Sequence, residues 1–222
     1  MRMTHLTAAH ISTVLRQRPP SNTSDWRTLR RKWTAEFATE APAVVIKVAA
    51  ELAGNGTWDR LTAYELIATH PGCVLALRPA SIHRLAKGLS DWPGVDTFGC
   101  YVAGPAWREG RLGTKHIDAW AHSRDRWQRR LALVCTVALN VRARGGHGDT
   151  VRTLAVCNQL IDDRDDMVVK ALSWALRALV QWDPAAVRQF VGNHEDRLAA
   201  RVKREVGTKL RTGLKNERRS IP

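Results

Sequence analysis

Apolar residues recur every three or four positions along almost the whole chain, and this spacing most limits how it can fold. Strict alternation of apolar and polar residues, which a half-buried strand would show, is absent over any useful length. The chain is therefore predicted to be all-α. The predicted helices lie near residues 3–17, 25–39, 42–54, 57–70, 79–90, 94–103, 115–122, 124–143, 148–162, 166–181, 184–193 and 196–214.

Short breaks rich in proline and glycine separate these segments, as at Pro19-Pro20, Pro71-Gly72 and Asp183-Pro184. Helix starts such as Ser24-Asp25, Asp91-Trp-Pro93 and Asp183-Pro184 offer N-cap chemistry. Each pair of helices is amphipathic and roughly 35–45 residues long, which favours a solenoid of antiparallel helix pairs over a closed bundle. We expect one domain over 1–214 with a concave basic face, and a basic tail over 215–222.

Charge and cysteine usage limit the partners and the compartment. The 222 residues include 35 Lys and Arg but only 21 Asp and Glu, which gives a formal net charge of +14. Nucleic acid is the first partner that this suggests, with an acidic membrane surface second. The four cysteines stand singly, without a C-x-x-C pair, so we expect free thiols in a reducing cytoplasm and no metal site. No signal peptide or membrane span is expected, and the protein is predicted to be soluble.

Three tryptophan-centred patches carry charge beside an indole ring. Exposed indole favours association, so we expect the patches to form one composite surface for a polyanion. The patches are Trp92-Pro-Gly-Val-Asp96, Arg126-Trp-Gln-Arg-Arg130 and Lys170-Ala-Leu-Ser-Trp174-Ala-Leu-Arg177.

In the last patch, Trp174 lies off the apolar stripe of its predicted helix. At about 100° per residue it shares the opposite side with Lys170 and Arg177. Either a neighbouring helix shields the indole while the two cations extend past it, or the indole is exposed between two phosphate-binding cations. The stripe itself consists of Val168, Leu172, Ala175, Leu176 and Leu179.

In the middle patch, Trp127 shares the stripe of Leu131, Val134 and Ala138 and is predicted to belong to the core. Arg130 lies among apolar neighbours, where an arginine is seldom buried without a partner. Either a carboxylate meets it or it reaches an anionic ligand.

In the first patch, Pro93 is predicted to be the first residue of a helix, which places Asp96 in the first turn. A carboxylate there can simply complement the helix dipole. Beside an indole in a basic protein it has the wrong charge for binding phosphate. It suits a ligand on which positive charge develops, as in glycosidic-bond cleavage.

These patches resemble motifs of the DNA alkylation repair family, the AlkD-like alkylpurine DNA glycosylases built of HEAT-like helical repeats. Trp92-x-x-x-Asp96 is similar to the family's W-x-x-x-D, and Trp127-Gln-Arg-Arg130 to its W-x-x-R. The stretch Lys170-Ala-Leu-Ser-Trp174-Ala-Leu-Arg177 resembles its K-A-x-x-W-x-L-R helix. The resemblance runs from about residue 57 to the end of the chain.

The resemblance implies a role for each matched residue. Asp96 would be the catalytic carboxylate, which stabilises the sugar cation and positions water. Trp92 and Trp174 would pack against the deoxyribose and backbone of the lesion nucleotide, and Arg130 would bind backbone phosphate. Further DNA contacts are expected from Arg126, Arg129, Lys170 and Arg177.

The family acts on N3- and N7-alkylated purines in duplex DNA, which are cationic and already good leaving groups. The resemblance therefore implies no metal and no organic cofactor. We expect the chain to act as a monomer.

The N-terminal segment departs from the family pattern. An aromatic contact expected there has no counterpart, although Thr28-Leu-Arg30-Arg31-Lys32-Trp33 could supply the basic helix. Two alternatives to a glycosylase therefore stay open. One is a non-catalytic binder of damaged or branched DNA, and the other is a HEAT-like scaffold for a protein partner. The acidic run from Asp162 to Asp166 lacks the spacing of a calcium loop, and Asp165 or Asp166 is predicted to cap a helix.

Overall fold

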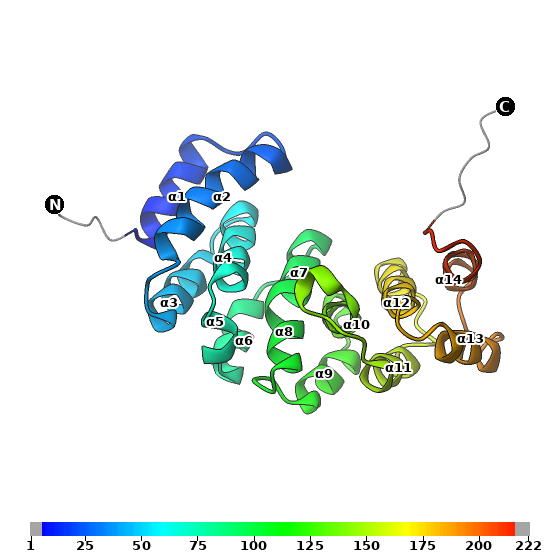
Figure 1. Cartoon of the computed structure of the whole chain (residues 1–222). Coiled ribbons are helices and arrows are strands. Elements are labelled where there is room, and N and C mark those ends of the chain that lie inside the picture. The colour runs from blue at the N-terminus through cyan, green and yellow to red at the C-terminus, as the bar shows by residue number, and fades with distance from the viewer. Residues whose placement is uncertain (1–5, 216–222) are drawn as a thin grey trace. The chain divides into compact units, whose positions relative to one another are not determined.

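Helices are the only regular elements among residues 6–215, the part of the chain that the structure, a computed structural model, describes (Figure 1). The all-α prediction is confirmed, and the packed helix pairs are consistent with a helical-repeat solenoid. The chain divides between Leu112 and Gly113 into two compact units.

The first unit holds the helices up to residue 112. Within it α3 packs against α4 and α6, while α4 also packs against α2 and α7. The helices are α1 (Ala8–Gln17), α2 (Thr23–Phe37), α3 (Pro42–Leu52), α4 (Thr57–Thr69), α5 (Cys73–Ala76), α6 (Pro79–Ala86), α7 (Trp92–Phe98) and α8 (Gly104–Arg108).

The second unit has α10 at its centre. This helix packs against α9, α11 and α12, and every residue from Arg130 to Asn140 is buried. The helices are α9 (Thr114–Ala121), α10 (Arg126–Asn140), α11 (Thr150–Gln159), α12 (Asp166–Leu179), α13 (Pro184–Asn193) and α14 (Ala200–Thr212).

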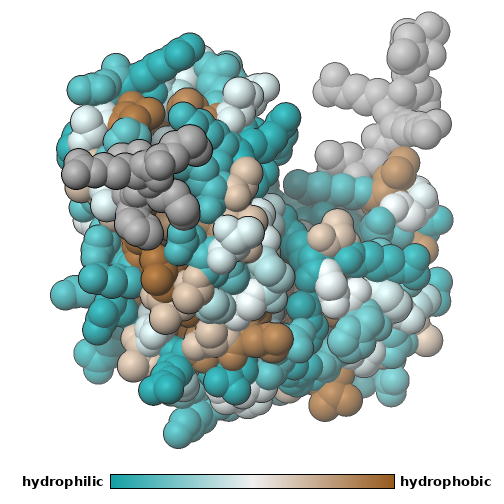
Figure 2. Space-filling view, turned by 60° about the vertical axis from the view of Figure 1, so that its left-hand side comes forward, coloured by the Kyte–Doolittle hydropathy of each residue, from teal (hydrophilic) through white to brown (hydrophobic). Residues whose placement is uncertain are grey.

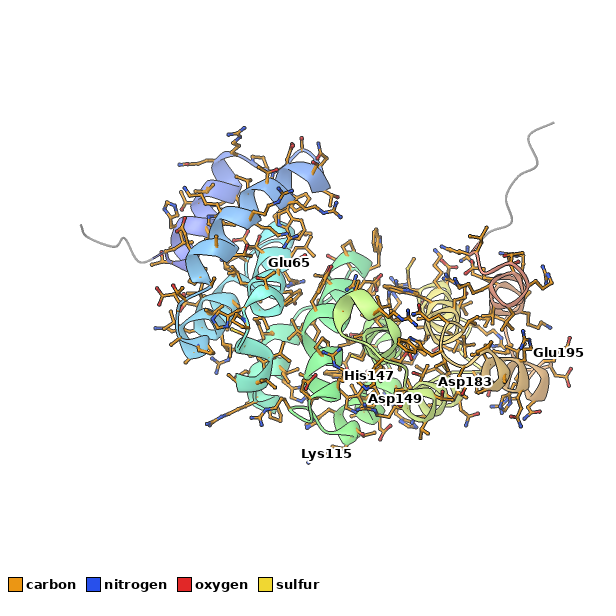
Figure 3. The ribbon with its side chains drawn as sticks, in the orientation of Figure 1. Glu65, Lys115, His147, Asp149, Asp183 and Glu195 are labelled. Atoms are coloured by element: carbon orange, nitrogen blue, oxygen red, sulfur yellow. The ribbon has the colours of Figure 1, made fainter. Side chains whose placement is uncertain are left out.

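Side-chain N-caps begin many of the helices, because the first amides of a helix have no partner within it. Asp149 and Asp183, labelled in Figure 3, cap α11 and α13. Asp91 caps α7 and Asp165 caps α12, as predicted. The predicted start at Ser24-Asp25 is wrong, because Asn22 accepts the amide hydrogens of both residues and α2 begins at Thr23.

The helix that begins with α7 is longer than its predicted end at residue 103. A π-helical segment, Gly99–Ala103, joins α7 to α8, and the backbone stays helical through Gly104. Pro105 supplies the physical reason. A proline has no N–H, and its ring would collide with the carbonyl four residues earlier in a regular α-helix. The wider turn accommodates the ring, so the helix continues to Arg108.

The core of each unit combines aromatic and aliphatic side chains. In the first unit the rings of Tyr64 and Phe98 lie 5.1 Å apart, and the Tyr64 hydroxyl donates to the Leu85 carbonyl over 2.8 Å. None of the described helices is long and apolar enough to cross a membrane. Hydrophilic residues cover most of the face seen in Figure 2, and its apolar residues form small separate patches.

Candidate functional site

Trp92, the first residue of α7, has an exposed side chain. Its exposed fraction is 57%, whereas Val95 and Phe98 of the same helix are fully buried. Asp96 follows one helical turn later and is half-buried. Residues four apart lie on one side of a helix, so indole and carboxylate are neighbours on the surface of α7.

The predicted place of Asp96 in the first helical turn is wrong. Asp91 caps the helix and accepts the Gly94 amide hydrogen over 2.7 Å, so α7 begins at Trp92 with Pro93 second. Asp96 is then the fifth residue, beyond the turn in which a carboxylate complements the unpaired amides. This position weakens the helix-dipole explanation for the residue.

Hydrogen bonds from α4 hold the turn before α7. Arg60 of α4 donates to the carbonyls of Ala53 and Gly88 over 3.1 and 3.0 Å. Gly88 has a φ of 73°, which favours glycine, and a Cβ at Gly94 would lie 2.8 Å from the Asp91 carboxylate. These local features position Trp92 and Asp96.

In the second unit, Trp127 is half-buried, so its predicted place in the core is wrong. It is the second residue of α10, where a side chain projects beyond the body of the helix. The Arg126 guanidinium lies 5.0 Å from the centre of the indole ring, in a cation–π contact, and 3.6 Å from the Asp165 carboxylate.

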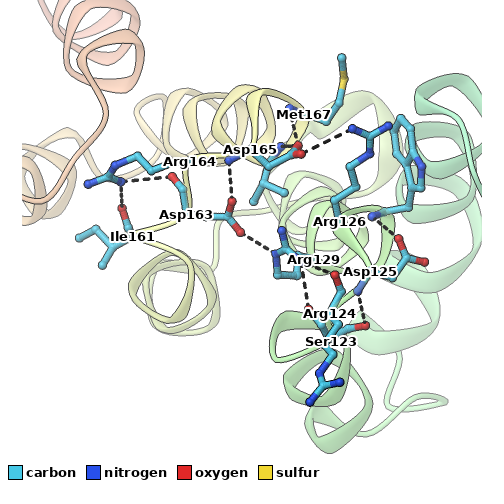
Figure 4. Close-up of polar contacts among 12 residues, drawn as sticks. Ser123, Arg124, Asp125, Arg126, Arg129, Ile161, Asp163, Arg164, Asp165 and Met167 are labelled. Atoms are coloured by element: carbon cyan, nitrogen blue, oxygen red, sulfur yellow. Dashed lines mark hydrogen bonds and ion pairs between the residues drawn. The ribbon is translucent and has the colours of Figure 1, made fainter.

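Two arginines of α10 hold the segment that leads into α12. Figure 4 shows the first of them, Arg129, which donates to the Asp163 carboxylate over 2.6 Å and to the carbonyl oxygens of Ser123 and Arg124. Arg130 is 6% exposed and donates to the Met167 carbonyl. The sequence predicts either a carboxylate or an anionic ligand as its partner, and this backbone carbonyl is one of the groups that it contacts.

Trp174 lies off the buried stripe of α12, as predicted. It shares a half-buried side of the helix with Lys170 and Arg177, while Leu172 and Leu176 are buried. Lys170 pairs with Asp166 over 2.6 Å and keeps 40% of its side chain exposed.

Arg177 is more enclosed than its neighbours on α12. It lies 3.5 Å from the Glu205 carboxylate of α14, and Ser173 joins both groups by hydrogen bonds. Burial lowers the pKa of Arg177, an effect that Glu205 partly offsets.

The five arginines and lysines predicted to contact DNA therefore differ in access. Arg126 and Lys170 have exposed side chains, whereas Arg129, Arg130 and Arg177 make internal contacts. No group of three or more potential ligands among residues 6–215 could hold a metal ion.

A family model described as DNA alkylation repair enzyme matches residues 15–210. The chain belongs to this family. No curated protein and no solved structure matches the chain. Membership assigns the chain a role as an enzyme of alkylation repair, acting on DNA. The match begins at residue 15, so it includes α2 and the end of α1, where the sequence departs from the family pattern.

Sequence reasoning missed the groups that engage the arginines. Asp163, Met167 and Glu205 lie more than 25 positions from the arginines they contact, and no local spacing connects them. The sequence predicts that Asp165 or Asp166 of the acidic run caps a helix, which is confirmed for Asp165. That Asp163 of the same run would bind Arg129 had no signal in the sequence.

Proposed function

We propose that the chain is a monofunctional DNA glycosylase that hydrolyses the N-glycosidic bond of cationic N3- or N7-alkylated purines in duplex DNA. One observation carries the proposal: a half-buried carboxylate, Asp96, follows an exposed indole, Trp92, by one helical turn in a member of a DNA alkylation repair family. The chain acts as a monomer in the cytoplasm and needs no cofactor.

Asp96 is the catalytic carboxylate. As the bond between C1′ and the purine nitrogen breaks, positive charge develops on the sugar, and a carboxylate nearby stabilises it. A water oxygen then bonds to C1′ and loses its proton to Asp96 or to solvent. The products are a neutral alkylated base and an abasic site.

A single carboxylate suffices for this reaction because the base is already a cation. Its departure takes the bonding electron pair and neutralises the ring, so no general acid has to protonate it. A site with one acid beside an indole is consistent with such a substrate, whereas ordinary glycoside hydrolysis needs two carboxyl groups.

Trp92 and Trp174 pack against the deoxyribose and backbone of the lesion nucleotide. The 57% exposure of Trp92 supports this role, because an indole left in water gains burial when a flat or apolar surface covers it. Trp174, between Lys170 and Arg177, combines an apolar surface with neighbouring cations.

Arg126 and Lys170 contact backbone phosphate, since their side chains are 53% and 40% exposed. Arg129 and Arg177 act as positioning residues, because both are engaged by acids of neighbouring helices. The phosphate contact of Arg130 stays a prediction. Its burial and its bond to the Met167 carbonyl favour a positioning role there too.

The test is release of free base from a duplex that contains N7-methylguanine. Asp96→Asn removes the charge but keeps the shape, so we expect base release at saturating enzyme to fall about 100-fold or more. Affinity for undamaged duplex should stay unchanged or rise slightly. Glu195→Gln, which neutralises an exposed acid on the second unit (Figure 3), is the matched control and should release base at the wild-type rate.

Two results contradict the proposal: no base release by the wild-type protein, or equal release by Asp96→Asn. The first, combined with tight and lesion-dependent binding, favours a non-catalytic binder of damaged or branched DNA. Absence of both turnover and DNA binding favours a scaffold for a protein partner.

A further inference from the structure

A cavity of about 800 Å³ lies in the first unit, among α3, α5, α6 and the segment that follows α8. In Figure 1 α3, α5 and α6 form one side of this unit, and α4 and α7 lie on the other. Its lining residues are Ala43, Ile46, Lys47, Ala50, Glu51, Ala76, Arg78, Ser81, Arg84 and Arg111.

The face of α3 that lines the cavity is turned away from α4. Its five lining residues recur at three- and four-residue spacing, from Ala43 to Glu51. The other face of α3 is buried against the rest of the unit and carries Val45, Val48, Ala49 and Leu52. The cavity and the α7 surface with Trp92 therefore belong to different layers of the unit.

Charge in this cavity is strongly unbalanced. Lys47, Arg78, Arg84 and Arg111 are all exposed and face one acid, Glu51. In the described part of the chain, none of these four forms an ion pair. Four like charges at one cavity repel one another, and an anion that enters relieves this repulsion.

Four arginines of the second unit show the contrast. Arg129, Arg177, Arg197 and Arg201 each meet a carboxylate within 4 Å. There the charges stabilise the fold and are already compensated. The cations of the cavity are not, so their chemistry is available to a ligand.

Small side chains in the cavity lining permit close approach of an extended strand. They are Ala43, Ala50 and Ala76, and the Ser81 hydroxyl adds a hydrogen-bonding group. The Arg111 Nε donates to the Leu77 carbonyl over 3.4 Å, which directs the guanidinium from the segment after α8. Cations and small side chains in one lining fit repeated phosphate groups on a thin backbone.

We propose that this cavity is a second DNA site, which binds the phosphodiester backbone of a DNA segment other than the one that carries the lesion. To follow both layers of the unit a duplex would have to bend sharply, which costs free energy, so we assign the two surfaces to separate segments. The proposal depends on DNA being the chain's substrate and not on base release. In this arrangement the enzyme binds one DNA segment at the cavity while its α7 surface contacts another.

The experiment measures binding of the full chain to a fluorescent, undamaged duplex between 50 and 200 mM salt. In the double variant Arg78→Gln/Arg84→Gln, the Kd at the low-salt end should rise about 10-fold. The slope of log K against log salt should become shallower by about 2. The matched control, Arg188→Gln/Arg204→Gln, removes two exposed charges elsewhere and should change both quantities by less than half as much.

A second measurement separates the two surfaces. With duplex in excess, native mass spectrometry should show two duplexes on the wild-type chain and one on the cavity variant. Because the duplex is undamaged, this measurement does not depend on base release. It therefore tests the second DNA site even if the chain releases no base. All the substituted residues are exposed, so the variants should melt within a few degrees of wild type.

Equal binding by the cavity and control variants overturns the proposal, as does a single duplex on the wild-type chain. Inorganic phosphate and a mononucleotide form the remaining arm. If either raises the Tm of wild type but not of the cavity variant, while duplex binding is unaffected, the cavity is a small-anion site and the DNA assignment is wrong.

Discussion

At the residue scale, the nine tryptophans show how one side chain takes several roles in this chain. Trp26, Trp33, Trp107 and Trp120 are at most 5% exposed and fill the core. Trp92 is 57% exposed, at the start of a helix whose supporting turn is tightly braced. An exposed indole gains burial when a ligand covers it, so Trp92 is the tryptophan that we assign to binding.

Replacing Trp92 and Trp26 should separate function from stability. Trp92→Ala removes little buried surface, so we expect unfolding free energy to change by less than about 1 kcal/mol. Trp26→Ala removes a buried ring and its hydrogen bond to the Thr62 hydroxyl, at a cost of about 3–5 kcal/mol. Urea denaturation measures both.

Base release should be reduced more by Trp92→Ala than by Trp26→Ala, the reverse of their effects on stability. At saturating enzyme, Trp92→Ala should lower it at least about tenfold, while any Trp26→Ala protein that folds should keep it. Trp92→Ala that is fully active, or that unfolds like Trp26→Ala, contradicts the assignment of this indole.

At the element scale, the turn between α10 and α11 brings backbone segments unusually close. A Cβ at Gly146 would lie 2.7 Å from the Val141 nitrogen and 2.8 Å from the Ala138 oxygen. Nearby, Gly148 has a φ of 91° and packs against the Trp182 ring. The turn therefore requires glycine for two reasons. At residue 146 any side chain would collide with the backbone, and at residue 148 the positive φ disfavours other residues.

Gly146→Ala and Gly192→Ala should shift stability in opposite directions. The first forces backbone atoms apart, and we expect a loss of about 2–4 kcal/mol. The second places a methyl group in open space within α13, where higher helix propensity should stabilise by about 0.5–1 kcal/mol. Thermal melting followed by circular dichroism compares them, and a neutral Gly146→Ala would show that the turn can relax.

At the scale of the whole molecule, buried acidic protons make stability sensitive to alkaline pH. Burial raises the pKa of Cys73 to about 12 and raises the pKa values of Cys157 and Tyr64 as well. All four cysteines are buried and lie outside disulfide bonds, as expected for thiols that play no surface role.

The contribution of these groups to the unfolding free energy should be fully present below about pH 9 and decrease at higher pH. Above that pH the unfolded chain releases the thiol protons while the folded chain retains them, so each such group lowers stability by up to about 1.4 kcal/mol per pH unit. Urea denaturation at pH 8 and pH 10.5 tests this. Cys73→Ala/Cys157→Ala should reduce the pH dependence, and an unchanged dependence would mean that the thiols do not cause it.

The sequence by itself determined the helices, many of their caps and the motifs of the family. These signals are local, because each involves residues only a few positions apart. They are the spacing of apolar residues, an aspartate before a helix, and a Trp and an Asp four positions apart. Even where a boundary was wrong, as at α7 and α8, the cause was local, because Pro105 widens the turn instead of ending the helix.

Only the tertiary structure decided which charged groups are available. Arg129 and Arg130 meet partners 34 and 37 positions away, and the cavity joins Lys47 to Arg111 across more than half of the first unit. Whether an arginine is compensated depends on which helix packs beside it, and helices distant in sequence meet through burial of their apolar faces. A local pattern can therefore show that a residue is charged, but it cannot show what that charge contacts.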